Sequence, residues 1–235
     1  MKRVERLGEA TAPDGSVLSL YRHDGAYSIR VDGEELMSTR RHHSEDVLAE
    51  LVCEPLRDQA DARVLIGGLG LGFTLKAALR SLGADARVVV AEIVEGVIQW
   101  NRNAEYDLAA EALADQRVEL RHDDVAHVLA SSPGAFDAIM LDVDNGAAAL
   151  TTRGNAKLYR ADGIRRAVAA LRPRGRLAYW SAGSDEAFEK ALGRAGLSVE
   201  VHRVRAHPSL KSWHTIFVAR RASEARDEAP GAANQ

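Results

Sequence analysis

The sequence contains one cysteine, Cys53, among its 235 residues. A single cysteine excludes an internal disulfide, and no set of cysteines and histidines has the spacing of a structural zinc site. A run of about 18 or more apolar residues, which a transmembrane helix requires, is absent. The segment Met1–Leu7 lacks the apolar core of a signal peptide. These absences predict a cytoplasmic protein without a membrane anchor or a metal site.

An excess of charge of one sign is also missing. The formal net charge is −3, and acidic and basic residues are dispersed along the chain. This balance gives no indication of non-specific nucleic-acid binding. Apolar residues make up 46% of the chain, which is enough for the core of one α/β domain with a small appendage.

The first part of the chain has the pattern of a small antiparallel sheet. Residues 17–21 and 27–31 alternate between apolar and polar, and turn signals follow at Asp24-Gly25 and Asp32-Gly33. We therefore predict a small β-domain over residues 1–42. A helix is expected to follow from Ser44, a suitable N-cap, to about Asp58.

From residue 63 onward, predicted strands and helices alternate, which favours a doubly wound parallel sheet. The strands are expected at residues 64–66, 88–91, 118–121, 136–142 and 176–180, followed by an antiparallel pair at 197–205 and 213–219. One long helix is expected over about residues 94–114. These elements define a predicted Rossmann-like catalytic domain over residues 43–221. Residues 222–235 contain no large apolar side chain and are expected to be disordered.

A glycine loop follows the first of these strands. Gly68, Gly70 and Gly72 alternate before an apolar helix, and Glu92 ends the next strand 20 residues later. Glycine lets the backbone approach a ligand closely, and an acid at this distance can bind ribose hydroxyls. The pattern predicts a nucleoside-binding βαβ unit. A tight turn with a solvated glutamate is the alternative.

Acidic residues stand at the ends of successive predicted strands. They are Glu92, Asp123, Asp124, Asp142 and Asp144. Ligands of open α/β sheets bind at this edge, so we expect the acids to surround one crevice. Glu92 would hold a ribose, and Asp123 would accept the adenine amino group with Ile93 against the base. Asp142 and Asp144 would face the reacting group. Helix capping and turn formation are the structural alternatives.

The order of these segments resembles the spermidine synthase family, the aminopropyltransferases. The matching pieces are Val64-Leu-Ile-Gly-Gly68, Ala91-Glu-Ile93, Asp115-Gln-Arg-Val118, His122-Asp-Asp124 and Phe136-Asp-Ala-Ile-Met-Leu-Asp142. The resemblance covers roughly residues 16–220. It implies a small N-terminal β-domain before a class I methyltransferase-like fold with a seven-stranded sheet. It also implies an adenosyl-sulfonium donor and an amine acceptor.

Three departures from the family pattern concern the donor and acceptor sites. The family's glycine loop carries an aspartate that holds the aminopropyl amine, whereas Gly67-Gly-Leu-Gly-Leu-Gly72 has no acid. The family's Asp-x-x-Asp-Pro segment is replaced by Asp142-Val-Asp144-Asn-Gly146, and its tyrosine before the first long helix is replaced by His42-His43-Ser44. A loop without an acid suits a methionine carboxylate. S-adenosyl-L-methionine is therefore favoured over decarboxylated S-adenosylmethionine.

Three further residues are candidates for binding the acceptor. His43 precedes the predicted helix, and Tyr179 and Trp180 end the fifth strand of the Rossmann-like part. A surface turn for His43 and core positions for the two aromatic residues are the structural alternatives. NAD is the main rival cofactor, because the glycine pattern alone does not exclude it.

The favoured function is methyl transfer from S-adenosylmethionine to a small nitrogen-bearing acceptor. Aminopropyl transfer to a polyamine and internal cyclisation of the methionine arm, which releases methylthioadenosine, are the enzymatic alternatives. A nucleoside-binding scaffold is the non-enzymatic one. A homodimer is expected through an exposed edge of the N-terminal sheet.

Overall fold

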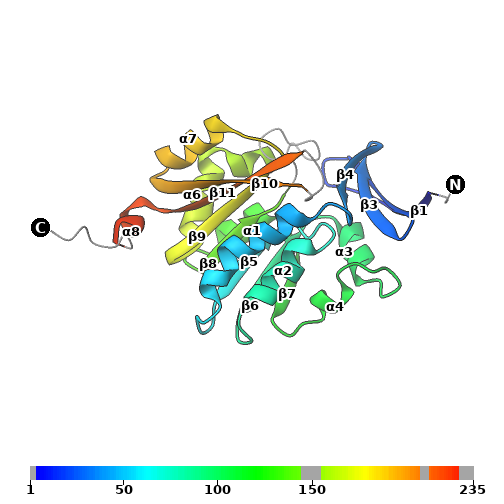
Figure 1. The fold of residues 1–235 in the computed structure, drawn as a ribbon, viewed down its shortest axis with the longest axis horizontal. Helices are drawn as coiled ribbons and strands as arrows, with labels where there is room; N and C mark the ends of the chain where they lie inside the picture. The colour runs from blue at the N-terminus through cyan, green and yellow to red at the C-terminus, as the bar shows by residue number, and fades with distance from the viewer. Residues whose placement is uncertain (1–3, 144–154, 207–211, 228–235) are drawn as a thin grey trace, which may run out of the picture.

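The computed structural model describes residues 4–143, 155–206 and 212–227. It contains two β-sheets, a small one built from the N-terminal strands and a large one covered by helices on both faces (Figure 1). This arrangement confirms the predicted α/β class and the separate N-terminal sheet. Within the described ranges, no helix is both long enough and apolar enough to cross a membrane.

The small sheet is antiparallel, with the strand order β1-β2-β3-β4. Its strands are β1 (Glu5–Thr11), β2 (Val17–His23), β3 (Ala26–Val31) and β4 (Glu34–Ser38). Leu20 and Ile29 lie in its buried face. Asp24 and Asp32, each followed by a glycine, have positive φ angles and form the predicted turns. The sequence pattern does not predict β1, because apolar and polar residues alternate only weakly there. Pairing of two subunits through an edge of this sheet stays a prediction.

The large sheet has seven strands in the order β10-β11-β9-β8-β5-β6-β7. They are β5 (Arg63–Gly67), β6 (Arg87–Glu92), β7 (Val118–His122), β8 (Phe136–Leu141), β9 (Leu171–Ser181), β10 (Leu197–Arg205) and β11 (Trp213–Arg221). Strands β5 to β9 pair in parallel, and β11 pairs antiparallel with both β9 and β10. This confirms the predicted antiparallel pair at the end of the sheet.

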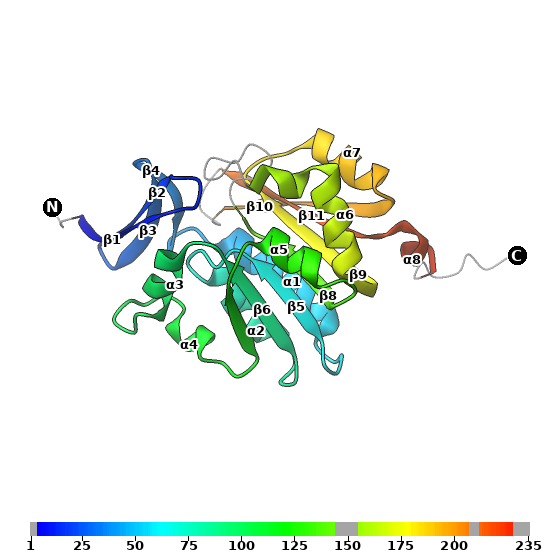
Figure 2. The ribbon, with the colours of Figure 1, turned by 180° about the vertical axis from the view of Figure 1, so that it is seen from behind.

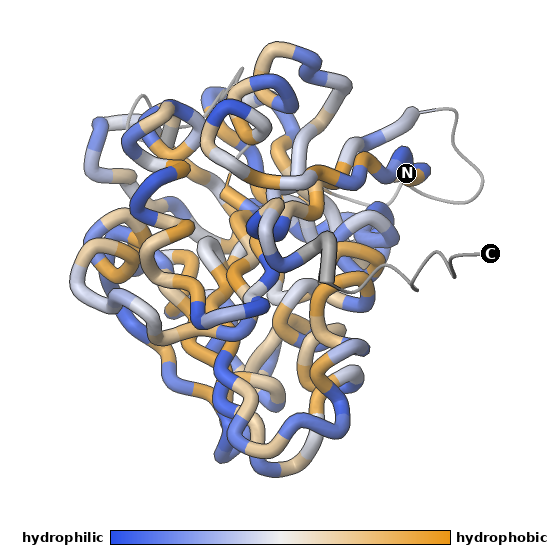
Figure 3. The backbone as a smooth tube through the Cα atoms, turned by 90° about the vertical axis from the view of Figure 1, so that its left-hand side faces the viewer, coloured by the Kyte–Doolittle hydropathy of each residue, from blue (hydrophilic) through white to orange (hydrophobic). Residues whose placement is uncertain are grey.

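Each face of the large sheet has its own apolar core. One face is covered by α1 (His43–Cys53), the short helix η1 (Glu54–Leu56), α2 (Phe73–Ser81), α3 (Glu95–Arg102) and α4 (Ala110–Leu113). The other is covered by α5 (Val125–Ser131), η3 (Asn155–Tyr159), α6 (Ala161–Ala170) and α7 (Glu186–Arg194), seen from behind in Figure 2. Hydrophobic stretches alternate with hydrophilic ones along the backbone, and much of the hydrophobic colour lies inside (Figure 3). The first core continues into the small sheet.

The single helix expected over residues 94–114 is wrong. The chain leaves the helical conformation after α3, and Asn103 accepts a hydrogen bond from the backbone N–H of Glu105. The interruption lets Tyr106 pack against Tyr27 of the small sheet, with 5.8 Å between the ring centroids, and buries Leu108. Tertiary packing therefore outweighs the helical pattern here.

The expectations for the C-terminal residues and for the domain division have different outcomes. Ala222–Asp227 forms helix α8, which corrects the prediction of disorder for these residues of the segment 222–235. Arg221, just before this helix, donates hydrogen bonds to the carbonyl groups of Val168 on α6 and Leu171 on β9 and so attaches this part of the chain to these two elements. The division at residue 42 falls between β4 and α1 and stays a prediction.

Candidate functional site

The glycine loop joins β5 to α2 and lies against the end of β8. Gly68 has a φ of +89°, and a Cβ atom there would lie 2.6 Å from the carbonyl oxygen of Asp142. A side chain would therefore push the loop away from β8. The predicted order of strand, loop and helix is confirmed, and the loop is held beside the residue that ends β8.

Gly72 lies at the end of the loop that is next to α2. It precedes α2 with a φ of +79°, and a Cβ atom there would lie 2.3 Å from the Cβ of Ala109. It lines neither of the two cavities described below. Its lack of a side chain allows close packing next to α4, and a contact between Gly72 and a ligand stays a prediction.

The Glu92 side chain is buried at the end of β6 and holds the loop from below. Its carboxylate oxygens accept hydrogen bonds from the backbone N–H groups of Leu69, at 2.9 Å, and Val94, at 2.8 Å. Burial raises the pKa of the Glu92 carboxyl, while these backbone donors oppose the shift. A carboxylate has about four acceptor positions, so Glu92 can also accept hydrogen bonds from the hydroxyl groups of a ligand.

A cavity of about 90 Å³ lies beside Glu92; we call it the β6 cavity. Of the predicted site residues, its lining contains Gly68, Gly70, Glu92, Ile93, Asp123, Asp124 and Asp142. Apolar residues of the small sheet, including Leu18 and Ile29, close the other side. The structure therefore brings the glycine loop and the acids of three strand ends to one cavity.

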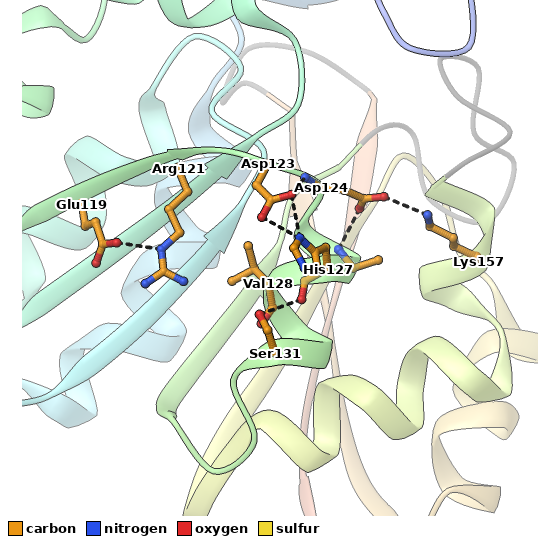
Figure 4. A network of polar contacts seen from close by, with 9 residues as sticks. Glu119, Arg121, Asp123, Asp124, His127, Val128, Ser131 and Lys157 are labelled. Carbon is orange, nitrogen blue, oxygen red and sulfur yellow. Dashed lines mark hydrogen bonds and ion pairs between the residues drawn. The ribbon is translucent and has the colours of Figure 1, made fainter.

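Asp123 and Asp124 differ in what their carboxylates already bind (Figure 4). Asp124 caps α5 by accepting from the N–H of Ala126 and pairs with Lys157 at 2.8 Å. Asp123 lies 2.9 Å from Nδ1 of His127, and this contact lowers the pKa of the Asp123 carboxyl. The structural role accounts for Asp124, whereas Asp123 stays a candidate for an adenine amino group.

A second cavity of about 230 Å³ lies on the other side of the loop; we call it the β11 cavity. It is lined by the loop residues Leu69, Gly70 and Leu71, by Trp180 at the end of β9, and by His214 on β11. The two cavities share four lining residues. These are Leu36, Met37, Gly70 and Asp142. The two cavities therefore adjoin at the loop and at Asp142.

Asp142 and Glu45 both face the β11 cavity. Asp142 accepts a hydrogen bond of 2.7 Å from Oγ1 of Thr74, in the first turn of α2. Glu45 lies in the first turn of α1. Burial, and to a smaller extent the negative charge of Asp142, raise the pKa of the Glu45 carboxyl to about 8. At neutral pH the Glu45 carboxyl group is therefore mainly protonated.

Ser44 connects the acid on α1 to the edge of the sheet. Its hydroxyl donates to Glu45 and accepts from Nε1 of Trp180 at 3.1 Å, and it lies 2.8 Å from Nδ1 of His214. Ser44 is thus not the predicted N-cap, since the helix begins at His43 and Ser44 is fully buried. Burial lowers the pKa of the His214 imidazole to about 4, with a contribution from the positive charge of Arg41. His214 is therefore neutral at pH 7.

Two of the expected acceptor residues do not reach the cavity. Tyr179 is fully buried on the opposite face of the sheet, with its ring 4.8 Å from that of Phe188 and 5.4 Å from that of Tyr159. Successive side chains of a strand point to opposite faces, which explains why Trp180 lines the cavity and Tyr179 does not. His43 is half-buried and lines neither cavity.

The remaining predictions concern Asp144 and metal binding. Asp144 lies outside the described residues. Among the residues that the structure describes, no group of three or more histidine, cysteine, aspartate or glutamate side chains converges as a metal site would require. Glu45, which the site analysis of the sequence did not include, lines the β11 cavity together with His214, whereas Tyr179 and His43 do not.

The raised pKa of Glu45 predicts a pH dependence of folding stability. An exposed glutamate loses its proton near pH 4.5, whereas the folded protein holds the Glu45 proton up to a pKa of about 8. The stabilisation is therefore complete below pH 4.5 and is lost as the pH rises through 8. We expect Glu45→Gln to gain roughly 2–4 kcal/mol in free energy of unfolding relative to wild type between pH 5 and pH 9.

Urea denaturation of the two proteins across this pH range measures that difference. The low pKa of His214 destabilises the fold as the pH falls below 6.5. This effect is present in both proteins and cancels in the difference between their unfolding free energies. A difference in unfolding free energy that does not change with pH would contradict a raised pKa for Glu45.

Comparisons with known proteins address the fold. In sequence, no protein-family model and no curated protein matches the chain. A spermidine synthase from Thermotoga maritima superposes with a TM-score of 0.71 at 17% identity, over 91% of this chain and 72% of that one. A spermidine synthase in complex with the transition state analogue AdoDATO gives 0.71 at 17% identity, over 96% and 76%. A probable spermidine synthase from Corynebacterium glutamicum ATCC 13032 gives 0.64 at 15% identity, over 97% and 82%.

These superpositions cover both the small sheet and the seven-stranded sheet. At such low identity the likeness concerns the fold, and it confirms the class I methyltransferase-like architecture with an additional N-terminal sheet. The chain is spermidine-synthase-like in its fold.

Proposed function

We propose that this protein is an aminopropyltransferase, which moves the propylamine arm of decarboxylated S-adenosylmethionine to a small amine. The observation that carries the proposal is the position of Asp142, which lines both cavities at the loop. The β6 cavity would hold the adenosine, and the β11 cavity would hold the propyl arm and the acceptor. The likeness to spermidine synthases supports the same assignment.

The charge of the β11 cavity suits an amine. Asp142 and Glu45 line it, and both acceptor and propyl arm carry ammonium groups that a carboxylate can bind. The sequence favours methyl transfer from S-adenosylmethionine because its loop has no acid. Glu45 weakens that argument, since it brings an acid to the same cavity from another element.

The reaction needs little from the protein besides position and removal of one proton. The acceptor nitrogen attacks the propyl carbon next to the sulfonium, a C–N bond forms, and the C–S bond breaks. The electron pair of that bond stays on sulfur and gives methylthioadenosine. Asp142 takes the proton of the attacking nitrogen, for which general base catalysis contributes about 10²–10⁴-fold. Glu92 and Asp123 would hold the ribose and the adenine.

Product analysis tests the proposal. The protein is incubated separately with S-adenosylmethionine and with its decarboxylated form, each with and without 1,4-diaminobutane, and the nucleoside products are separated by chromatography. We expect methylthioadenosine only with the decarboxylated donor and the diamine together.

Other products would contradict aminopropyl transfer in distinguishable ways. S-adenosylhomocysteine would indicate methyl transfer, which the acid-free loop favours. Methylthioadenosine formed without an amine would indicate internal cyclisation. Donor binding without any product, across a panel of amines, would indicate a nucleoside-binding protein.

A further inference from the structure

The glycine loop brings no carboxylate to the β11 cavity, but helix α1 does. Leu69, Gly70 and Leu71 line the cavity with backbone and apolar side chains, and Glu45 enters it from the first turn of α1. Glu45 and the loop are far apart in sequence, so the cavity is completed by the packing of α1 beside α2. The carboxylate therefore lies in the same cavity as the loop without belonging to it.

The Glu45 side chain is held in a defined orientation by Ser44. A hydroxyl group has one proton and two acceptor positions. Because Ser44 donates to Glu45 and accepts from Trp180, its remaining acceptor position faces Nδ1 of His214. Three elements, α1, β9 and β11, thus fix one carboxyl group in the wall of the cavity.

No cation in the described part of the chain neutralises this carboxyl group by an ion pair. The nearby charges are Asp142 across the cavity, Asp46 on the same helix, and Arg41, which pairs with Glu35 instead. Asp46 in turn pairs with Arg80 and His42. A buried carboxylate without a partner is unfavourable, so Glu45 holds a proton at neutral pH. A cationic ligand would supply the partner that lets this group ionise.

We infer that Glu45 receives the ammonium group of the donor's propyl arm and selects the decarboxylated donor over S-adenosylmethionine. The inference rests on the proposed function. The two donors differ only in a carboxylate on the carbon that carries the ammonium group. An ammonium placed against Glu45 would bring that carboxylate close to Glu45 and Asp142, where like charges repel.

Glu45→Gln tests the inference by donor binding alone. Glutamine keeps the shape of the protonated carboxyl group, so the variant is expected to fold. Calorimetric titration with each donor should show that wild type prefers the decarboxylated form by about tenfold or more, and that Glu45→Gln loses most of this preference. Asp46→Asn, which removes a charge one residue away and lines neither cavity, should keep it.

Proton release gives a second readout. At pH 7 the decarboxylated donor should displace close to one proton from wild type as Glu45 ionises, and almost none from Glu45→Gln; titrations in buffers of different ionisation enthalpy measure this number. If Glu45→Gln keeps the preference for the decarboxylated donor and methylthioadenosine is still formed, the role of Glu45 is overturned and the proposed transferase activity stands. If wild type binds neither donor, the role of Glu45 and the proposed transferase activity are both overturned.

Discussion

Asp142→Asn is expected to lower the turnover of aminopropyl transfer by about 10²–10⁴-fold and to change donor affinity by less than about threefold. Asparagine is isosteric with aspartate and keeps an oxygen that can accept the hydrogen bond from Thr74. The loop and the end of β8 should therefore keep their geometry. What is lost is the group that accepts the proton from the attacking amine.

The measurement is single-turnover formation of methylthioadenosine as a function of pH, with donor affinity determined separately. The rate of wild type should fall at low pH, where its carboxylates are protonated. The rate of Asp142→Asn should no longer show the part of this fall that comes from protonation of Asp142. Thr74→Val is the matched control, because it removes the hydrogen bond but keeps the carboxylate. Turnover of Asp142→Asn within twofold of wild type would remove Asp142 from the mechanism.

Glu92→Ala is expected to weaken binding of methylthioadenosine by about 10–100-fold, since hydrogen bonds to a charged group contribute about 1.5–3 kcal/mol. The Glu92 carboxylate lies in the β6 cavity and also supports the loop through Leu69 and Val94. Loss of affinity alone would thus not distinguish ribose binding from loop support.

A nucleoside without ribose hydroxyls separates the two roles. Wild type should bind methylthioadenosine more tightly than its 2′,3′-dideoxy analogue, and Glu92→Ala should bind both about equally. If the variant still prefers the ribose form as strongly as wild type does, Glu92 supports the loop and does not bind the hydroxyl groups. Fluorescence or calorimetric titration is sufficient for this comparison.

Much of the fold is predictable because its signals are local. The apolar run Val64–Ile66, the alternating glycines and the acid at residue 92 lie within one short segment, and each has the expected place in the structure. The turns at Asp24 and Asp32 follow from residues that tolerate positive φ. The break between α3 and α4 is not predictable in this way, because it depends on contacts between Tyr106 and the small sheet.

The cavity residues show the same distinction. Glu92, Asp123 and Asp142 are found from the sequence because parallel strands bring their carboxyl ends to one edge of the sheet. Tyr179 and Trp180 are neighbours with the same apparent signal, yet a strand sends them to opposite faces. Nothing in the local pattern shows which of the two faces the cavity.

Local sequence pattern is therefore sufficient for the order of strands and helices, the glycine loop and the acids at the strand ends, since each depends on residues a few positions apart. The acceptor side of the site has no such signal. Ser44 and His214 are 170 positions apart, and the hydrogen bond between them forms only when α1 packs against β11. The position of Glu45 in the cavity, and its elevated pKa, are consequences of that packing and of the burial it imposes.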